Sequence, residues 1–457
     1  MAKVRAVAAN RARDREQPRN VPWHVLIAAS ALAVAATLHI ALLVSLDSGS
    51  LNFLFNDAEN RLGRGSDFFA VYGAGHNFLH GASVYATVDG DSTVPYAYPF
   101  RYLPFMAFSI GAIVSVMPAW TAYWSWVALT EILLLINVAL TWRFAPNTRW
   151  SVIGTCMWLL FTPYYLELYM GQFSFVMASL FFWLGLTLRS LSKTPAMTSW
   201  TASLLVKTNS LLFLPFLWKL HLGRGVAIGL ALVLVLNVPY FLAVDGSWDA
   251  WSGNFRSLEE NTVFDPHAGN LGLVSLLHLP TVDAGEGPLE RTAVAAARLP
   301  WSLAILAVAG AATLLACFTH RLRLLALWTC TYFLVFGEVW EHHYVMLLPV
   351  LVLLVLFDEK LRVPALATYV FVALPTPYAL LQTSVPPLDF GVSDPQSYWS
   401  TAGVYAQHLS KVLPTALLWL ALVLQVSQGD RRGVGDNVSF NLRTTESRVR
   451  RRLLPAR

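Results

Sequence analysis

Long apolar runs separated by short polar segments dominate the chain from residue 21 to about residue 428. The first run extends from Val21 to about Leu46, and about 20 apolar residues are enough for a helix to cross a bilayer. Further runs follow at roughly 102–117, 119–142, 150–168, 170–188, 198–217, 225–244, 301–318, 322–338, 345–357, 361–382 and 408–427. The pattern predicts an all-α polytopic membrane protein with about twelve transmembrane helices.

Lysine and arginine in short loops indicate the cytoplasmic side of a membrane protein. The basic segments are the N-terminus (1–20), 219–224, 319–323, 358–362 and the Arg-rich tail (429–457). Alternation from these segments predicts external loops at 47–101, 245–300, 337–343 and 383–405. The rule conflicts with alternation between 118 and 198, because Arg143 and Arg149 are external if both preceding runs cross. One or two runs in that stretch are therefore expected to be re-entrant or broken.

Composition supports the assignment to membrane proteins and indicates which binding partners are expected. Of 457 residues, 56% are hydrophobic and only 13% are charged, whereas globular domains average about 25% charged residues. The net charge of +5 comes from the chain ends and short loops, not from one basic face, so membrane lipids are expected as partners and nucleic acid is not. The three cysteines lie in apolar runs and are expected to be buried thiols.

The segment GSDFFAVYGAGHNFLHGASVYA (65–86) carries an acid just after the first run. Apolar and small residues recur in it at three- and four-residue spacing, which predicts an amphipathic helix at the outer membrane surface. Asp67 has two interpretations. It caps the helix N-terminus together with Ser66, or it acts as a general base that removes a proton from an acceptor hydroxyl.

Other polar residues stand out against apolar surroundings. Arg101, in YAYPFRYLPF, either binds a phosphate or extends to lipid headgroups. Lys207, inside an apolar run, either binds the phosphate of a lipid carrier or pairs with Glu167. Glu167 and Gln172 either line a cavity or end a broken helix at Gly171.

The external turn GEVWEHH (337–343) places two histidines between two apolar runs. His342 and His343 point in different directions on a helix, so they are expected to donate hydrogen bonds to a phosphate or sugar, or to have no chemical role, rather than to bind a metal. The DGD sequence (89–91) is read as a turn. No metal and no cofactor is expected. The further residues predicted to line a cavity are Tyr72, Tyr102, Gln172, Asn270 and Trp340.

In this order the motifs resemble the polyprenyl-phosphate-mannose-dependent mannosyltransferases of glycosyltransferase family 87, integral-membrane enzymes of the GT-C fold. The matching features, between about residues 60 and 350, are DFFAVYGAG followed by GASVY, FRYLPF, GQ after a span, a lysine before LLFLP, GN in the second long loop, and W-x-H-H before a span. Two features depart from the pattern: Thr208 follows the lysine where proline is expected, and GNLGL (269–273) lacks the glutamine often found after GN.

The resemblance implies Asp67 as the catalytic base and His342 or His343 as the partner of the donor phosphate. Arg101 and Lys207 match positions where relatives carry polar or basic groups. The implied reaction is an inverting transfer of mannose from polyprenyl-phosphate-mannose to a glycolipid or polysaccharide hydroxyl, at the external face of the plasma membrane, by a membrane domain over 21–428. The alternatives are an arabinofuranosyltransferase of the same family, a transporter or flippase of a lipid-linked glycan, and a non-catalytic subunit.

Overall fold

The computed structural model describes residues 23–55, 63–86, 93–95, 98–189, 192–259, 263–264, 270–283, 289–375 and 401–427. Four of the predicted features lie outside these ranges: the basic N-terminus (1–20), the DGD sequence (89–91), most of the external segment 383–405, and the tail (429–457).

The regular secondary structure of the described residues is helical apart from one pair of short antiparallel strands, β1 (Val263–Phe264) and β2 (Leu289–Glu290). The first elements are α2 (Trp23–Ser48), η1 (Asn52–Leu54), α4 (Ser66–Leu79), α5 (Pro104–Met106), the π-helix η2 (Ala107–Gly111), α6 (Ala112–Val114), α7 (Ala119–Phe144), α8 (Thr148–Leu159), α9 (Pro163–Met170), α10 (Ser174–Arg189), α11 (Lys193–Val206) and η3 (Thr208–Phe213). The others are α12 (Leu214–Lys219), α13 (Gly223–Ala243), α14 (Ser247–Glu259), β1 (Val263–Phe264), α15 (Leu273–Asp283), β2 (Leu289–Glu290), α16 (Arg291–Leu315), α17 (Arg321–Val335), η4 (Glu341–Met346), α18 (Leu348–Phe357), α19 (Arg362–Ala373) and α21 (Thr401–Ser427).

Among the described residues, five helices are long and apolar enough to cross a membrane alone, so the twelve or so crossings that the sequence predicts are not confirmed. They are α2, α7, α13, and the segments Ala296–Leu315 of α16 and Tyr405–Ser427 of α21. Four shorter apolar helices accompany them: Pro104–Val114, Ser174–Arg189, Glu341–Phe357 and Arg362–Ala373. The run predicted at 102–117 is only this first short helix, which at about 1.5 Å per residue is about half the thickness of a bilayer core.

Two other predicted runs are interrupted. The run at 150–168 divides into α8 and α9, with Leu160–Thr162 between them. The run at 198–217 divides into α11, η3 and α12, and Lys207 has extended backbone at the first break. Non-helical backbone at membrane depth is tolerated where protein surrounds it or where it lines a cavity. Both breaks therefore mark positions where polar backbone meets the interior of the bundle.

The helix predicted after residue 65 is present as α4, but its amphipathic character is wrong. Every residue from Ser66 to Gly75 is buried, and exposure begins only towards the C-terminal end. The reason is a close approach to the short helix α5–η2–α6. A Cβ on Gly75 would lie 2.0 Å from the carbonyl carbon of Gly111, so the two backbones touch. Surrounding elements therefore cover the face that the sequence assigns to water.

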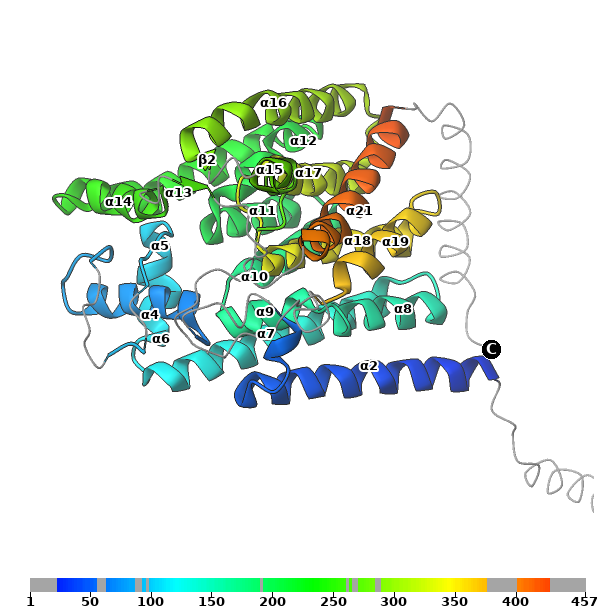
Figure 1. Ribbon diagram of the computed structural model, residues 1–457, viewed down its shortest axis with the longest axis horizontal. Coiled ribbons are helices and arrows are strands. Elements are labelled where there is room, and N and C mark those ends of the chain that lie inside the picture. Colours follow the sequence, from blue (N-terminus) through cyan, green and yellow to red (C-terminus); the bar gives the residue numbers. More distant parts are fainter. Residues whose placement is uncertain are drawn as a thin grey trace, which may run out of the picture.

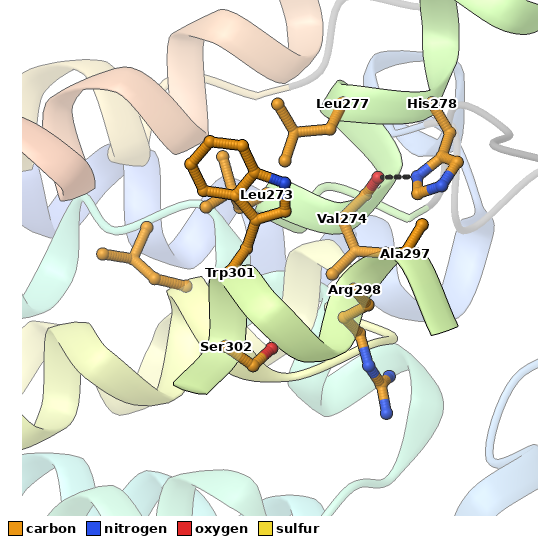
Figure 2. A pocket seen from close by; sticks show the side chains of 9 residues that line it. Leu273, Val274, Leu277, His278, Ala297, Arg298, Trp301 and Ser302 are labelled. Atoms are coloured by element: carbon orange, nitrogen blue, oxygen red, sulfur yellow. Dashed lines mark hydrogen bonds between the residues drawn. The ribbon is translucent and has the colours of Figure 1, made fainter. Parts of the chain in front are cut away.

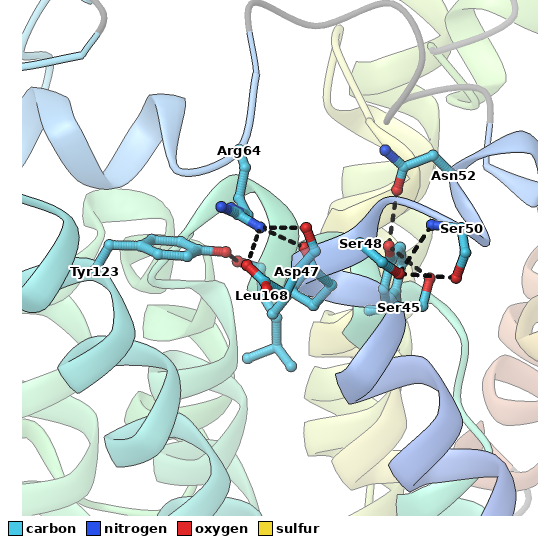
Figure 3. Close-up of polar contacts among 10 residues, drawn as sticks. Ser45, Asp47, Ser48, Ser50, Asn52, Arg64, Tyr123 and Leu168 are labelled. Atoms are coloured by element: carbon cyan, nitrogen blue, oxygen red, sulfur yellow. Dashed lines mark hydrogen bonds and ion pairs between the residues drawn. The ribbon is translucent and has the colours of Figure 1, made fainter.

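The start of α4 is fixed by backbone contacts with two other helices. Arg64 Nη1 donates to the carbonyls of Leu46 and Asp47, 2.9 Å each, and pairs with Asp47 Oδ1 at 3.0 Å (Figure 3). The N–H of Gly65 donates to the carbonyl of Tyr169 at 2.7 Å. Because these bonds join the end of α2 to the end of α9, they set the position of the first turn of α4.

Basic side chains gather at the opposite end of the bundle. The Arg189 guanidinium lies 3.4 Å from the centre of the Phe357 ring, and that of Arg362 lies 4.0 Å from the centre of the Trp150 ring. These contacts bring together the ends of α10 and α18 and the starts of α8 and α19. Figure 1 shows α8 and α19 at this end, and α4, α5 and α14 at the other.

The C-terminal helix α21 reaches the predicted histidine turn through a buried ion pair. Lys411 Nζ lies 3.2 Å from Glu341 Oε1, and the two side chains are 1% and 2% exposed. The same ammonium donates to the carbonyls of Val372, at 2.8 Å, and Leu374, where α19 ends. A buried pair requires such additional hydrogen bonds to offset its desolvation. Lys411 therefore holds the start of η4 against α19 and α21.

Replacing Gly75 with alanine is expected to destabilise the protein. The added methyl group has no space beside the Gly111 backbone, and overpacking of this kind costs about 1–3 kcal/mol. Gly310→Ala in α16 is the matched control, because a Cβ there meets nothing within 4 Å. Thermal unfolding in detergent, followed by tryptophan fluorescence, should show a lower midpoint for Gly75→Ala only. Equal midpoints for both variants would contradict the close approach.

Lys411→Met is expected to lower the free energy of unfolding by about 3–5 kcal/mol, because it leaves the Glu341 carboxylate buried without its cation. Adding Glu341→Gln to the same chain should recover much of the loss. Lys193→Met, at an exposed lysine, is the control and should leave the unfolding midpoint unchanged. A double variant as unstable as Lys411→Met alone would show that the charge pairing is not the cause.

Candidate active site

The turn between α9 and α10 is the point on which the candidate residues converge. It begins at Gly171, whose φ of +65° is a conformation that favours glycine. A Cβ on Gly171 would lie 2.5 Å from Cβ of Phe68, the residue after Asp67. The turn therefore packs directly against the first turn of α4, and only glycine fits there on both counts.

Gln172 follows in this turn and connects two other segments. Its side-chain oxygen accepts a hydrogen bond from Lys207 Nζ at 3.1 Å and from the Tyr102 hydroxyl at 3.3 Å. Its backbone carbonyl accepts from the indole N–H of Trp126 at 3.3 Å. The Trp126 ring in turn lies 4.4 Å from that of Phe173. Lys207 and Tyr102 thus orient the Gln172 side chain, and Trp126 holds its backbone.

Lys207 and Glu167 both form hydrogen bonds at or beside the α9–α10 turn, but they do not form an ion pair with each other. Lys207 Nζ donates to Ser174 Oγ at 2.7 Å in addition to Gln172. Glu167 Oε1 accepts from the N–H of Phe175 at 2.6 Å, at the start of α10. The carboxylate is 1% exposed and interacts electrostatically with Lys207. The structure therefore does not support direct pairing with Glu167, which is one of the two interpretations of Lys207.

Asp67 lies in the first turn of α4, where the N-cap residue is Gly65 and not Asp67 itself. The side chain is 8% exposed, and its charge interacts with those of Glu167 and Lys207. It also acts on Tyr102: burial raises the pKa of this phenol well above its usual value, and the neighbouring Asp67 carboxylate raises it further. The phenol therefore stays protonated and remains a donor beside the carboxylate.

The histidine turn packs against the same two helices, since η4 contacts both α9 and α10. His342 is 1% exposed, and its ring centre lies 4.3 Å from that of the partly buried His343. Nδ1 of His343 accepts the backbone N–H of Trp340 at 3.2 Å, so its proton resides on Nε2 when the ring is neutral. Both imidazoles thus lie on η4, the helix that packs against α9 and α10.

Two of the predicted residues, Asn270 and Tyr72, have evident packing partners. The side-chain oxygen of Asn270 accepts the N–H of Val339 at 3.0 Å, and its amide donates to Gly337 at 3.3 Å, so it clamps the histidine turn. Tyr72 donates to the carbonyl of Met117 at 2.7 Å. These contacts hold backbone segments in place.

Arg101 contacts helix α14. Its Nε donates to the carbonyl of Asn254 at 2.9 Å, and its guanidinium carbon lies 5.2 Å from the centre of the Tyr98 ring. The Asn254 amide donates back to the carbonyl of Phe100 at 3.0 Å. Arg101 therefore ties the segment before α5 to α14, one residue before Tyr102.

Sequence reasoning missed Trp126, Ser174 and Lys411. Lys411 carries the same signal as Lys207, an ionisable residue inside an apolar run, which could have identified it. Ser174 follows Gln172 closely in GQFS, but a serine in an apolar run is too common to stand out. Trp126 was one of 17 tryptophans, and only its contact with Gln172 distinguishes it.

Together these groups place a carboxylate, an ammonium and a phenol around one turn, and the segment that carries the imidazoles packs against the two helices that this turn joins. Such a set can accept a proton from one ligand and hold the negative charge of another. Within the described residues, no group of three or more His, Cys, Asp or Glu side chains is arranged to hold a metal ion.

Comparison with known proteins assigns a family to this arrangement. A search of curated proteins finds no match. The model of glycosyltransferase family 87 matches residues 100–337, slightly more than half of the chain, and this interval contains Lys207 and the whole α9–α10 turn. The predicted resemblance is confirmed: the chain belongs to glycosyltransferase family 87 and is a membrane glycosyltransferase.

Proposed function

We propose that the protein transfers mannose from polyprenyl-phosphate-mannose to the hydroxyl of a glycolipid or polysaccharide, with inversion at the anomeric carbon. The observation that supports this most is that the first turn of α4, which carries Asp67, and Lys207 meet at the α9–α10 turn, while the histidine turn packs against the same two helices. The donor has a stable leaving group in its phosphate. Catalysis therefore requires a base, an anchor for the phosphate and an enclosed, oriented cavity.

In this mechanism Asp67 accepts the proton of the acceptor hydroxyl, and the hydroxyl oxygen forms a bond to the anomeric carbon. The bond between that carbon and the phosphate oxygen breaks on the opposite side, and polyprenyl phosphate leaves with the electron pair. An ammonium has three donors, and the two described bonds of Lys207 use two of them. Lys207 then holds the departing phosphate with the third, and His342 or His343 donates a further hydrogen bond.

Two features support a reaction at the external face of the plasma membrane. The short helix Pro104–Val114 covers about half of a bilayer core, so α7 is the second crossing in this topology. Arg143 and Arg149 then return to the cytoplasmic side, as the distribution of positive charge requires. With one crossing fewer, this topology agrees with the positive charge between 118 and 198, which supports the proposal. Asp67 precedes α7 in the chain and therefore lies, in this topology, at the external end of that helix.

The identity of the sugar depends on residues near Lys207 and Asn270. Thr208 and GNLGL depart from the motif of the mannosyltransferases, which keeps arabinofuranose as the second candidate sugar. Both sugars use the same leaving group and the same base, so the proposed roles of Asp67 and Lys207 do not depend on the choice.

Asp67→Asn is expected to reduce transfer about 100- to 10,000-fold, the usual contribution of a general base. The assay follows sugar-labelled polyprenyl-phosphate-mannose, and separately the arabinofuranose donor, in membranes that contain the protein. Asp249→Asn is the matched control, since Asp249 also lies in the first turn of a helix, α14, but is exposed.

Equal transfer by a folded Asp67→Asn variant and the wild type would refute the role as base. Movement of the labelled lipid across vesicles with no transfer by either protein would favour a flippase. Transfer from the arabinofuranose donor alone would correct the sugar and leave the role of Asp67 intact.

Lys207→Met is expected to lower kcat/KM about 10- to 100-fold, because hydrogen bonds to charged groups contribute about 1.5–3 kcal/mol. Lys207→Arg should restore part of the activity, since it keeps the charge. Lys193→Met serves as the control at an exposed lysine. Unfolding midpoints recorded in parallel separate a binding role from a structural one. An unchanged kcat/KM in Lys207→Met would contradict a role at the phosphate.

A further inference from the structure

A single arginine attaches the segment that leads into α4 to the end of α2. Arg64 lies three residues before Asp67 in the chain. Its Nη1 donates to the carbonyls of Leu46 and Asp47 at 2.9 Å each, and it pairs with the Asp47 carboxylate at 3.0 Å (Figure 3). The side chain of Arg64 is 23% exposed and that of Asp47 is 75% exposed. Because exposed ion pairs contribute little to stability, the two backbone carbonyls are the stronger attachment.

Two tryptophans of α7 contact the same guanidinium. Its central carbon lies 5.0 Å from the centre of the Trp124 ring and 5.2 Å from the centre of the Trp120 ring. The two tryptophans are four residues apart, so they lie on one face of the helix. A cation over an indole ring is attracted by the negative charge of the ring face. Arg64 therefore joins the start of α4 to α7 as well as to α2.

The next residue extends the attachment to α9. The N–H of Gly65 donates to the carbonyl of Tyr169 at 2.7 Å. A Cβ on Gly65 would lie 3.0 Å from Cδ2 of Tyr123, so the backbone contacts this ring. The Tyr123 hydroxyl in turn donates to the carbonyl of Leu168 at 2.9 Å (Figure 3). Three helices, α2, α7 and α9, thus hold the two residues that precede α4.

The position of Asp67 depends on where α4 begins. Asp67 lies in the first turn of this helix, two residues after Gly65. Its side chain is only 8% exposed, so it has little room to compensate for a shift of the backbone. A displacement of about 1 Å in a reacting group can lower a rate about 100-fold. The contacts of Arg64 therefore bear directly on the placement of the carboxylate.

We propose that Arg64 is a positioning residue for the transfer reaction, which holds the Asp67 carboxylate where it meets the acceptor hydroxyl. The proposal rests on the proposed function for the role of Asp67 as base, and on the contacts of Arg64 for its placement. Arg64 acts through the start of α4 and not on the reacting atoms. Arginine suits this position because its planar group donates in its own plane and packs on aromatic rings with its faces, which an ammonium cannot do.

Arg64→Gln is expected to lower kcat about 10- to 100-fold and to leave the KM for the donor unchanged, because it moves the base and not the donor. The assay follows transfer from sugar-labelled polyprenyl-phosphate-mannose by the purified full chain in nanodiscs. Arg143→Gln is the matched control: Arg143 lies at the other end of α7, is exposed, and its guanidinium carbon is 5.7 Å from the centre of the Phe144 ring. Arg64→Lys keeps the charge without the planar group and should be intermediate. A wild-type kcat in Arg64→Gln would overturn the proposal.

Trp120→Leu tests the contact with the indole ring alone. It is expected to lower kcat about two- to fivefold, the loss that corresponds to one cation–π contact at a partly exposed site. Trp301→Leu is the control, since Trp301 is also exposed and lines a groove between α15 and α16, beside Leu273 (Figure 2). An equal loss in both variants would assign the effect to any surface tryptophan and would contradict the role of Arg64.

A double variant separates positioning from a general loss of stability. If Arg64 acts through Asp67, Arg64→Gln should have little further effect on the residual transfer of a chain that already carries Asp67→Asn, because coupled residues do not contribute additively. A purely structural role would instead lower transfer by the same factor in both backgrounds. That result would overturn the proposal.

Hydrogen–deuterium exchange at residues 65–70 gives a readout that does not require activity. Exchange there should be faster in Arg64→Gln than in the wild type and Arg143→Gln, because the start of α4 has lost its attachment. Unchanged exchange would overturn the role of Arg64. Faster exchange combined with full transfer by Asp67→Asn would instead refute the base in the proposed function, so the two failures are distinguishable.

Discussion

The approach of α4 to the α9–α10 turn depends on the absence of a side chain at Gly171. A methyl group there would overlap Phe68, and the left-handed backbone at this position would be strained for other residues. The contact brings the first turn of α4, which carries Asp67, to the α9–α10 turn, about 100 residues later in the chain. Lys207 reaches the same turn from the end of α11, and the histidine turn packs against α9 and α10. Most of the candidate chemistry depends on this one close approach.

Burial changes what these polar groups can do. Asp67, Glu167 and His342 are each less than one tenth exposed, so their charges and dipoles interact in a medium of low dielectric. A carboxylate beside an ammonium in such surroundings can accept a proton while the ammonium compensates developing phosphate charge. The hydrogen bonds of Gln172 and the ion pair of Lys411 keep these groups oriented before any ligand binds. Preorganisation of this kind supports a group-transfer reaction more than passive lipid binding.

The two ends of the bundle carry different groups of charged and polar side chains. At one end arginines stack on aromatic rings near α8 and α19, where basic residues suit the cytoplasmic surface of a membrane. At the other end, α4, the α9–α10 turn and the histidine turn carry the buried polar side chains of the candidate active site.

The sequence by itself determined the membrane class, the helical fold and the family, because apolar runs, sparse charge and the order of short motifs are local properties of the chain. It also predicted the helix after residue 65 and singled out Asp67 and Lys207. Only the tertiary structure decided that α4 is buried on all sides from Ser66 to Gly75, that Pro104–Val114 is too short to cross, and that Lys207 meets Gln172 and not Glu167. Hydrophobic periodicity reports one face of a helix, and it carries no information on which distant segment covers the other faces.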